Sequence, residues 1–199
     1  TTVYGIGPAK AQYLVKECNV KSILDLSKKL DDVSLTSAQQ LGVRHYSDLK
    51  KRIRRAEIST YESLLQNNLR KLDPAIRMCI AGSYRRGNKT SGDIDVLLTS
   101  SSELRMEDIL QSISSKSTIE TVGILAKGKK KSMLLTRINK KAVRHMDIII
   151  TTPEQFPFAQ LYFTGSKIFN IKMRQHALKK GYHLNEYNLT PVESVEFAD

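Results

Sequence analysis

The chain has 199 residues, which is room for one large domain or a few packed subdomains, and its 40% apolar content is enough for a core. Lys and Arg outnumber Asp and Glu by 32 to 20, and the resulting net charge of +12 indicates a polyanionic partner. Two cysteines without a CxxC motif favour a reducing compartment and argue against a zinc cluster, and no apolar run reaches the length of a membrane span.

The first block of the sequence, residues 1–58, is predicted to form short helices separated by glycine turns. Pro8 suits the first turn of a helix that continues over residues 9–17. Further helices are expected over residues 22–30 and 37–53. The chain begins inside its first motif, and we therefore interpret it as a fragment of a longer protein.

The second block, residues 59–152, opens with an amphipathic helix expected over residues 59–72, which Ser59 or Thr60 can cap. A second helix is expected in SELRMEDILQSISS. Four runs rich in β-branched and aliphatic residues predict strands: MCIAGSY, DIDVLLT, KKSMLLTRI and VRHMDIIIT.

The third block, residues 153–199, contains one predicted helix, KIFNIKMRQHALKK, which Ser166 caps and Gly181 ends. Phe169, Met173 and Ala177 are expected to form its apolar stripe. A short polar segment, HLNEYNLTPVE, follows. Together the three blocks predict an α+β fold.

Basic residues gather at 50–55 (KKRIRR), 127–131 (KGKKK) and 139–144 (NKKAVR). One such run by itself is best interpreted as a solvated surface. Three runs together with the overall excess of positive charge favour a nucleic acid as the partner.

The strongest chemical signal is Gly82-Ser83 followed, after nine residues, by Asp93-Ile94-Asp95. Side chains i and i+2 of a strand share a face, so the two carboxylates lie side by side while Ile94 faces the core. Like charges at an apolar strand require a cation, and Mg²⁺ binds carboxylate and phosphate oxygens. An isolated DxD would instead be a solvated turn at the end of a strand.

Asp147, within HMDIIIT, completes the site if its strand lies beside the first. Three carboxylates can hold two Mg²⁺ about 3.5–4 Å apart, one activating a hydroxyl and one stabilising the leaving phosphate. Backbone N–H groups at the Gly82-Ser83 turn can bind phosphate oxygens.

These strings carry a family resemblance. The GS-x9-DxD pattern resembles the signature of the nucleotidyltransferase superfamily, and TTVYGIGPAKA resembles a helix-hairpin-helix. Together with LYFTGSKIFNIKMRQHALKKG, LNEYNL and VRHMDIIIT, in this order along the chain, they resemble the X-family DNA polymerases, the repair group that includes DNA polymerase beta.

The resemblance implies a role for each matching position. It implies metal binding by Asp93, Asp95 and Asp147, with Mn²⁺ able to replace Mg²⁺. The implied nucleotide-binding residues are Arg52, Ser83, Arg86, Gly92, Tyr162, Phe163, Gly165 and Asn170. The implied template and primer contacts are Lys127, Lys130, Lys131, His145 and Arg174. A monovalent cation, Na⁺ or K⁺, is expected at backbone carbonyls of Thr1, Val3 and Ile6.

The resemblance further implies three subdomains: a helix-hairpin-helix subdomain (1–58), a palm with the carboxylates in a sheet flanked by helices (59–152), and a small nucleotide-selection subdomain (153–199). We expect a monomeric, intracellular enzyme, nuclear or viral, that extends the primer of gapped or nicked duplex DNA with deoxynucleotides. The alternatives are a template-independent or RNA-tailing nucleotidyltransferase, and a non-catalytic module that binds gapped DNA.

The sequence departs from these relatives in several places. Their N-terminal lyase domain and a further C-terminal segment have no counterpart in the 199 residues, so nothing predicts lyase activity. Lys167 replaces a residue that is acidic in some relatives, and His145 stands where relatives usually have Arg. We expect His145, two residues before Asp147, to lose its charge across neutral pH. In the alternative, His145 packs as a neutral ring and Arg144 makes the primer contact.

Overall fold

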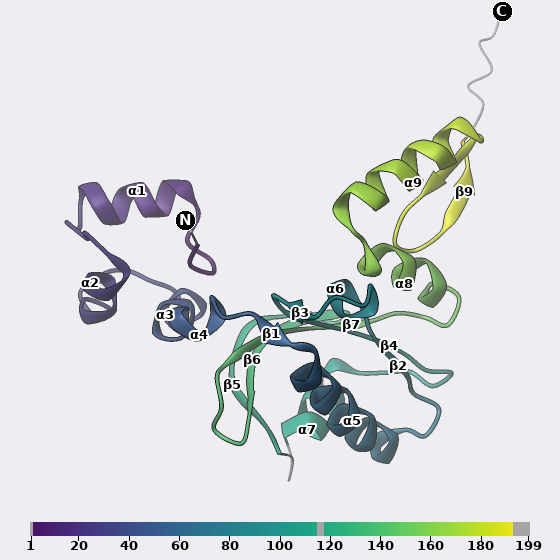
Figure 1. Ribbon diagram of the computed structural model, residues 1–199, viewed down its shortest axis with the longest axis horizontal. Helices are drawn as coiled ribbons and strands as arrows, with labels where there is room; N and C mark the ends of the chain where they lie inside the picture. The colour runs from purple at the N-terminus through teal and green to yellow at the C-terminus, as the bar shows by residue number, and fades with distance from the viewer. Residues whose placement is uncertain (1, 115–117, 193–199) are drawn as a thin grey trace, which may run out of the picture.

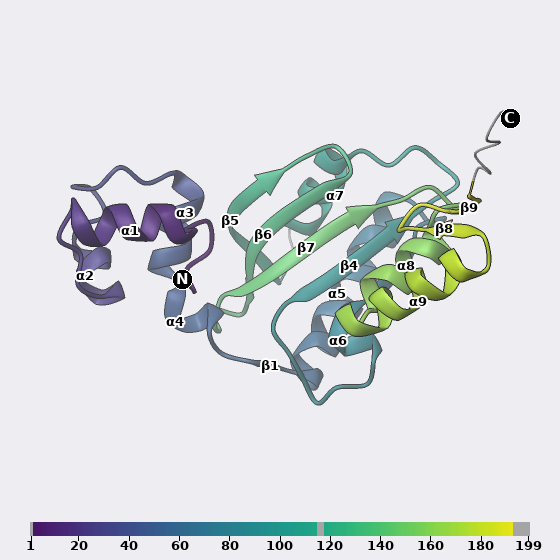
Figure 2. The same ribbon diagram turned by 90° about the horizontal axis from the view of Figure 1, so that it is seen from above.

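The computed structural model describes residues 2–114 and 118–192. Three parts lie in a row in Figure 1: an N-terminal group of helices, a central sheet with two helices beneath it, and a C-terminal part above the far end of the sheet. Seen from above in Figure 2, the N-terminal helices lie beside one edge of the sheet and the C-terminal helices lie over the other side. No described helix combines the length and the apolar character needed to cross a membrane.

The N-terminal part has its own small core. The first two predicted helices are confirmed, but the helix predicted over residues 37–53 is interrupted at His45, whose backbone leaves helical geometry. Ser22 and Thr36 cap helices by accepting hydrogen bonds from backbone N–H groups. The helices are α1 (Pro8–Lys16), α2 (Ile23–Lys28), α3 (Ser37–Arg44) and α4 (Tyr46–Leu49). Their core consists of Val3, Ile6, Leu14, Val20, Leu26, Leu30, Val33 and Val43.

The longest helix, α5 (Arg55–Leu72), lies beneath the sheet beside α7 (Met106–Ser114). The predicted start and cap of α5 are wrong. The helix begins at Arg55, before the residues proposed as its cap. Ser59 instead places its hydroxyl 3.0 Å from the Tyr84 hydroxyl, and the Thr60 hydroxyl donates to a backbone carbonyl one turn earlier. The buried face of α5 consists of Ile58, Tyr61, Leu65 and Leu69.

The central sheet contains strands at the four predicted places and a fifth that the sequence did not predict. The predicted strand MCIAGSY is only partly right, because the strand ends at Ile80 and the Gly-Ser pair begins the short helix α6 (Gly82–Arg85). The strand order in the sheet is β2 (Arg77–Ile80), β4 (Ile94–Thr99), β7 (Arg144–Ile150), β6 (Lys131–Ile138) and β5 (Ile119–Lys127). Strand β4 runs parallel to β7, whereas the other neighbouring pairs are antiparallel. Strand β5 is the unpredicted one, and two register shifts interrupt its pairing with β6. Two short strands, β1 (Ile53–Arg54) and β3 (Thr90–Ser91), pair outside this sheet.

The C-terminal part begins with α8 (Phe156–Thr164), which was not predicted, and continues with α9 (Lys167–Lys179). The predicted cap of α9 is confirmed, because the Ser166 hydroxyl accepts from the backbone N–H of Phe169. The apolar stripe expected on this helix is only partly buried: Ala177 is buried, but Phe169 is 39% exposed. The segment expected to be irregular forms a hairpin of β8 (Tyr182–Leu184) and β9 (Leu189–Pro191).

An apolar cluster joins the N-terminal part to the edge of the sheet. From the sheet it takes Leu125, Leu135, Val143, Val122 and Met133, and from the N-terminal part Tyr4, Ala38, Leu41 and Leu49. Strand β5 comes so close to α3 here that a side chain added at Gly123 would collide with Leu41. We call this set of residues the interface cluster.

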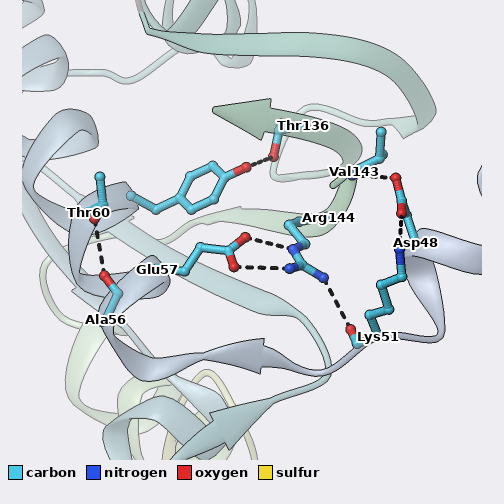
Figure 3. Close-up of polar contacts among 9 residues, drawn as sticks. Asp48, Lys51, Ala56, Glu57, Thr60, Thr136, Val143 and Arg144 are labelled. Carbon is cyan, nitrogen blue, oxygen red and sulfur yellow. Dashed lines mark hydrogen bonds and ion pairs between the residues drawn. The ribbon is translucent and has the colours of Figure 1, made fainter. Parts of the chain in front are cut away.

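Polar contacts reinforce the interface cluster (Figure 3). Arg144 at the start of β7 is 8% exposed and forms two hydrogen bonds of 2.7 and 2.9 Å with the Glu57 carboxylate on α5. The same guanidinium donates to the backbone carbonyl of Lys51. The Asp48 carboxylate accepts from the backbone N–H of Val143, which contributes to holding the pKa of Asp48 below its usual value. The N-terminal part is therefore fixed to the strand that carries Asp147.

Candidate active site

Three carboxylates meet at one end of the central sheet. Asp93 is exposed just before β4, Asp95 is half-buried on β4, and Asp147 is buried on β7. Because β4 and β7 pair in parallel with Asp95 directly opposite Asp147, the two side chains lie on the same face of neighbouring strands. Ile94 is fully buried in the core on the other face. The predicted adjacency of the two acidic strands is confirmed.

The clustering of negative charge shows most clearly at Asp95. Burial, reinforced by the neighbouring Asp93 and Asp147 carboxylates, raises the pKa of Asp95 to about 7. Gly82 lies against this carboxylate: a Cβ at position 82 would collide with Asp95 Oδ2, and its φ of +56° is in the region that favours glycine. The Gly-Ser pair of the sequence motif is therefore needed for close approach to Asp95 as well as for the turn.

Asp147 has two basic neighbours and one oxygen without a hydrogen bond. The Lys131 ammonium lies 2.6 Å from Oδ2, and His145 Nε2 lies 3.2 Å from Oδ1. The histidine contact is close but its hydrogen-bond geometry is poor, so both Nε2 and Oδ1 are buried without a hydrogen bond. Lys131, expected to contact the template or primer, lies at the carboxylates.

These carboxylates fit a hard divalent cation. Asp147 Oδ1 is an orphaned buried acceptor, and the raised pKa of Asp95 reflects its burial together with neighbouring negative charge that the site does not fully compensate. Within residues 2–114 and 118–192, no three His, Cys, Asp or Glu side chains are placed so that they could hold a metal ion by themselves. Mg²⁺ does not need three protein ligands, because water and substrate phosphate commonly supply most of its coordination.

An open cavity of about 770 Å³ includes Asp93 and Asp95 in its lining and brings together the predicted nucleotide-binding residues. Four cationic side chains also line it. Its lining includes Arg52, Gly82, Ser83, Arg86, Gly92, Asp93, Asp95, Tyr162, Phe163, Gly165, Lys167, Asn170 and Arg174. All eight residues predicted for nucleotide binding are among them.

Hydrogen bonds fix the cations and the hydroxyl on the sheet side of this cavity. Arg52 donates to the hydroxyl and the backbone carbonyl of Thr90 at 3.2 and 2.8 Å. The Ser83 hydroxyl donates to the Ser91 hydroxyl at 2.8 Å. Arg86 donates to the Thr164 carbonyl at 2.6 Å, which ties the turn to the end of α8.

The C-terminal side of the cavity has aromatic and amide groups. Tyr162 and Phe163 pack edge to face with ring centroids 5.1 Å apart. Asn170 donates to the Tyr162 carbonyl at 2.8 Å, and Arg174 places its guanidinium 5.6 Å from the Tyr162 ring centroid. Asn170 and Arg174, predicted to share a helix face, both line the cavity.

Other predicted residues lie away from this cavity. Lys127 pairs with Glu107 at 3.0 Å, and Lys130 is exposed without an ion pair to any described residue. The carbonyl of Val3 accepts from the backbone N–H of Ile6 at 3.2 Å, so it already has one partner. Thr1, the third residue expected at the monovalent-cation site, lies outside the described residues.

The two basic residues at the start of β7 face opposite sides. His145 lies with Asp147 at the carboxylates, whereas the Arg144 guanidinium is occupied by Glu57 and the Lys51 carbonyl. The alternative in which Arg144 makes the primer contact therefore finds no support. Sequence reasoning missed Tyr4, whose ring centroid lies 5.8 Å from that of His145. No local pattern marks this contact, because it joins residues that are far apart in the sequence.

Comparisons with known proteins agree with this architecture. Family profiles described as DNA polymerase beta palm, DNA polymerase beta thumb and fingers domain of DNA polymerase lambda match residues 52–154, 159–199 and 1–50. DNA polymerase lambda of Rattus norvegicus is 33% identical over 82% of this chain and 31% of its own length. DNA polymerase lambda of Arabidopsis thaliana is 29% identical over 95% of this chain and 37% of its own.

A solved structure extends the likeness to three dimensions. The crystal structure of Leishmania infantum polymerase beta in a ternary gap complex superposes with a TM-score of 0.89 at 30% identity, covering 98% of this chain and 69% of that one. A mixed α+β fold with a palm sheet flanked by helices is thus shared.

The fold and the family profiles together define a chain with the palm, thumb and fingers of the DNA polymerase beta and lambda type. The chain belongs to the X family of DNA polymerases, whose members use a divalent metal cofactor. It spans about a third of the length of the two curated relatives described above. From here on, the N-terminal helices, the sheet with its helices and the C-terminal part are called fingers, palm and thumb.

Proposed function

We propose that the chain is a template-directed DNA polymerase that adds deoxynucleotides to a primer 3′-hydroxyl, filling short gaps in duplex DNA. One observation carries this proposal: Asp95 lines a cavity together with four cationic side chains, and Asp147 lies beside it on the neighbouring parallel strand. That arrangement can hold a triphosphate beside carboxylates that bind metal. The solved relative named above is itself a ternary gap complex.

The residues divide the work in a way that follows from their positions. Arg52, Arg86, Lys167 and Arg174 offset the charge of the triphosphate, while the turn at Gly82 and Ser83 offers backbone N–H groups and a hydroxyl. Tyr162 and Phe163 pack beside the nucleotide sugar and crowd a 2′-hydroxyl.

Asp93, Asp95 and Asp147 would hold two Mg²⁺, which lower the pKa of the primer hydroxyl and neutralise the departing pyrophosphate when bound. The side chains of the protein attract the metal ions and hold the carboxylates in place. The negative charge of three clustered carboxylates attracts the cations, and Lys131 and His145 keep Asp147 in place beside Asp95. The cationic cavity wall attracts the negatively charged triphosphate.

Primer extension tests this proposal. The parent protein with Mg²⁺ should extend a gapped duplex with the complementary nucleotide alone, and should not extend single-stranded DNA. Asp147→Asn should lower the extension rate by at least about a thousandfold, because metal binding contributes several kcal/mol to the transition state. Affinity for the gapped duplex, measured by fluorescence anisotropy, should change by less than about threefold because basic side chains dominate it.

Asp108→Asn is the matched control. It makes the same chemical change in an exposed pair with Arg105 on α7, away from the carboxylates, and should leave extension unchanged. Extension of single-stranded DNA without a template would favour a template-independent transferase. A loss of less than about tenfold in Asp147→Asn would contradict the metal-binding role of this residue.

A further inference from the structure

We propose that Tyr4 is a positioning residue for the third carboxylate, holding Asp147 in place through His145. The inference rests on the proposed function, because it assigns Asp147 to metal binding. Tyr4 stands in the turn before α1, far from Asp147 in sequence, yet its side chain reaches the palm strand that carries Asp147.

The backbone of Tyr4 is held in place from the fingers side. Its neighbours Val3 and Ile6 are buried in the fingers core, so the turn is anchored on either side of it. Gln39 donates to the Gly5 carbonyl at 2.7 Å. On α3, Gly42 comes so close that an added Cβ would lie 3.1 Å from the Tyr4 carbonyl oxygen. A ring carried on so constrained a backbone can hold its neighbours in place.

The side chain points out of the fingers core and into the interface cluster. Its ring centroid lies 5.8 Å from that of His145, within the range of favourable aromatic contacts, with the planes tilted by 47°. Its hydroxyl donates to Met133 Sδ at 3.3 Å. Both neighbours flank Asp147: His145 precedes it by two residues on the same strand face, and Met133 is its cross-strand partner on β6.

Asp147 needs such support because its contacts with Lys131 and His145 do not fix the orientation of its carboxylate. Lys131, on a long side chain that is 47% exposed, approaches Oδ2, and His145 lies near Oδ1 without an aligned hydrogen bond. A small rotation of the imidazole would bring its ring against Oδ1 or release it. The tyrosine ring blocks one side of that rotation, so it sets where the Asp147 oxygens face Asp95.

The first experiment measures the metal affinity of Asp147 without relying on catalysis. Mn²⁺ binding is followed by electron paramagnetic resonance in the parent, Tyr4→Leu and Tyr4→Phe. Tyr4→Leu should weaken Mn²⁺ binding by about three- to tenfold, the range that corresponds to loss of one aromatic contact. Tyr4→Phe keeps the ring and should stay within about twofold of the parent. Equal Mn²⁺ affinity in the parent and Tyr4→Leu would overturn the inference.

Tyr13→Leu is the matched control, since Tyr13 is an exposed fingers tyrosine whose ring contact is with Lys10 on the same helix. It should leave Mn²⁺ binding unchanged. Primer extension supplies a second measurement: Tyr4→Leu should lower kcat by a similar factor with little change in the KM for DNA. A tyrosine that only packs the interface would lower stability and leave the kcat of the folded enzyme intact, which would contradict the inference.

A double-mutant cycle tests the route through His145. In a His145→Ala background, Tyr4→Leu should weaken Mn²⁺ binding by less than about twofold. If Tyr4→Leu still causes its full loss of Mn²⁺ affinity in that background, the route through His145 is wrong. If Tyr4→Leu does not fold, nuclear Overhauser effects between the Tyr4 and His145 rings of the parent still decide the contact. A parent that binds Mn²⁺ but extends no primer would defeat the proposed function and leave the positioning role testable.

Discussion

The palm carries the fingers and the thumb by two different kinds of attachment. On the fingers side, the interface cluster joins the two parts over apolar surface, and Arg144 and Val143 of the palm donate to the Lys51 carbonyl and the Asp48 carboxylate. On the thumb side, Phe156 and Ala159 of α8 pack on the sheet, but only Ala177 of α9 is buried. Towards the end of α8, Phe163 packs against the same apolar cluster, and arginine side chains of the palm donate hydrogen bonds to Thr164.

The difference indicates which part can move. A segment with few buried apolar contacts opens at low free energy, whereas one held by a buried cluster opens only with the fold. We therefore expect the fingers to stay fixed relative to the carboxylates while α9 changes position as a nucleotide enters. Three predictions test this contrast, and we take them from the largest expected effect to the smallest.

Breaking the buried ion pair that holds Arg144 beside the fingers should cost the most. The Arg144 guanidinium also donates to the Lys51 carbonyl, and Glu57→Gln leaves it buried beside a neutral side chain, which should lower the free energy of unfolding by about 3 kcal/mol. Urea titration followed by circular dichroism measures this loss. Glu120→Gln is the control, because Glu120 forms the same two-bond pair with Arg137 at the surface and its loss should cost far less stability. Equal costs would show that the buried pair is no stronger than a surface pair.

The carboxylates between the two attachments should make stability depend on pH. The pKa of Asp95 is about 7 in the folded protein, whereas an unfolded Asp has a pKa near 3.9. Between these values the folded protein holds a proton that the unfolded chain has released. The free energy of unfolding should therefore fall by about 2.5 kcal/mol as the pH rises from 5 to 8 in EDTA.

The control for this pH dependence is Asp95→Asn, which removes the titrating carboxyl. Burial lowers the pKa of His45, which acts in the opposite direction, so the informative quantity is the difference between parent and variant at each pH. Saturating Mg²⁺ should abolish the difference in slope, because a bound cation favours the ionised carboxylate. If the parent and the variant show the same pH dependence between pH 5 and 8, Asp95 is already ionised in the metal-free folded protein, which would contradict the prediction.

Removing a thumb contact should cost least. Arg85 donates to the Thr164 hydroxyl at 3.2 Å on the surface and does not line the cavity, so Arg85→Ala should lower the free energy of unfolding by less than about 0.5 kcal/mol. Its KM for nucleotide should equal that of the parent. Arg86→Ala, which changes a cavity residue, should raise that KM instead. A large loss of stability in Arg85→Ala would mean that the thumb is held as firmly as the fingers.

Local patterns predicted what depends on neighbours in sequence. The alternation of Asp93, Ile94 and Asp95 placed two carboxylates on one face, and Ser166 marked the start of α9. Secondary-structure prediction failed where the hydrophobic pattern did not vary along the segment. The segment FPFAQLYFT of α8 has apolar residues on all sides, so it shows neither helical nor strand periodicity. Strand β5 was missed for a related reason, because its register shifts disturb alternation.

Contacts between distant segments had no local signal at all. Glu57 and Arg144 show nothing in their own surroundings that pairs them, and Tyr4 lies in a motif that explains its glycine neighbours but not its ring. The family resemblance indicated which residues line the cavity, because motifs shared with a family also indicate which residues lie together in its fold. It gave no guidance at the positions where this chain departs from its relatives, such as His145.

The parallel pairing of β4 with β7 has a consequence for how the protein is made. Parallel neighbours need a long crossover, and here α7 and the β5–β6 hairpin lie between the two strands. During synthesis on the ribosome, the chain carries Asp93 and Asp95 well before Asp147 emerges. We therefore expect a nascent chain that ends before β7 to bind metal poorly, so that the active site forms only when the sheet closes. On the proposed function, a nascent chain without β7 would therefore extend no primer.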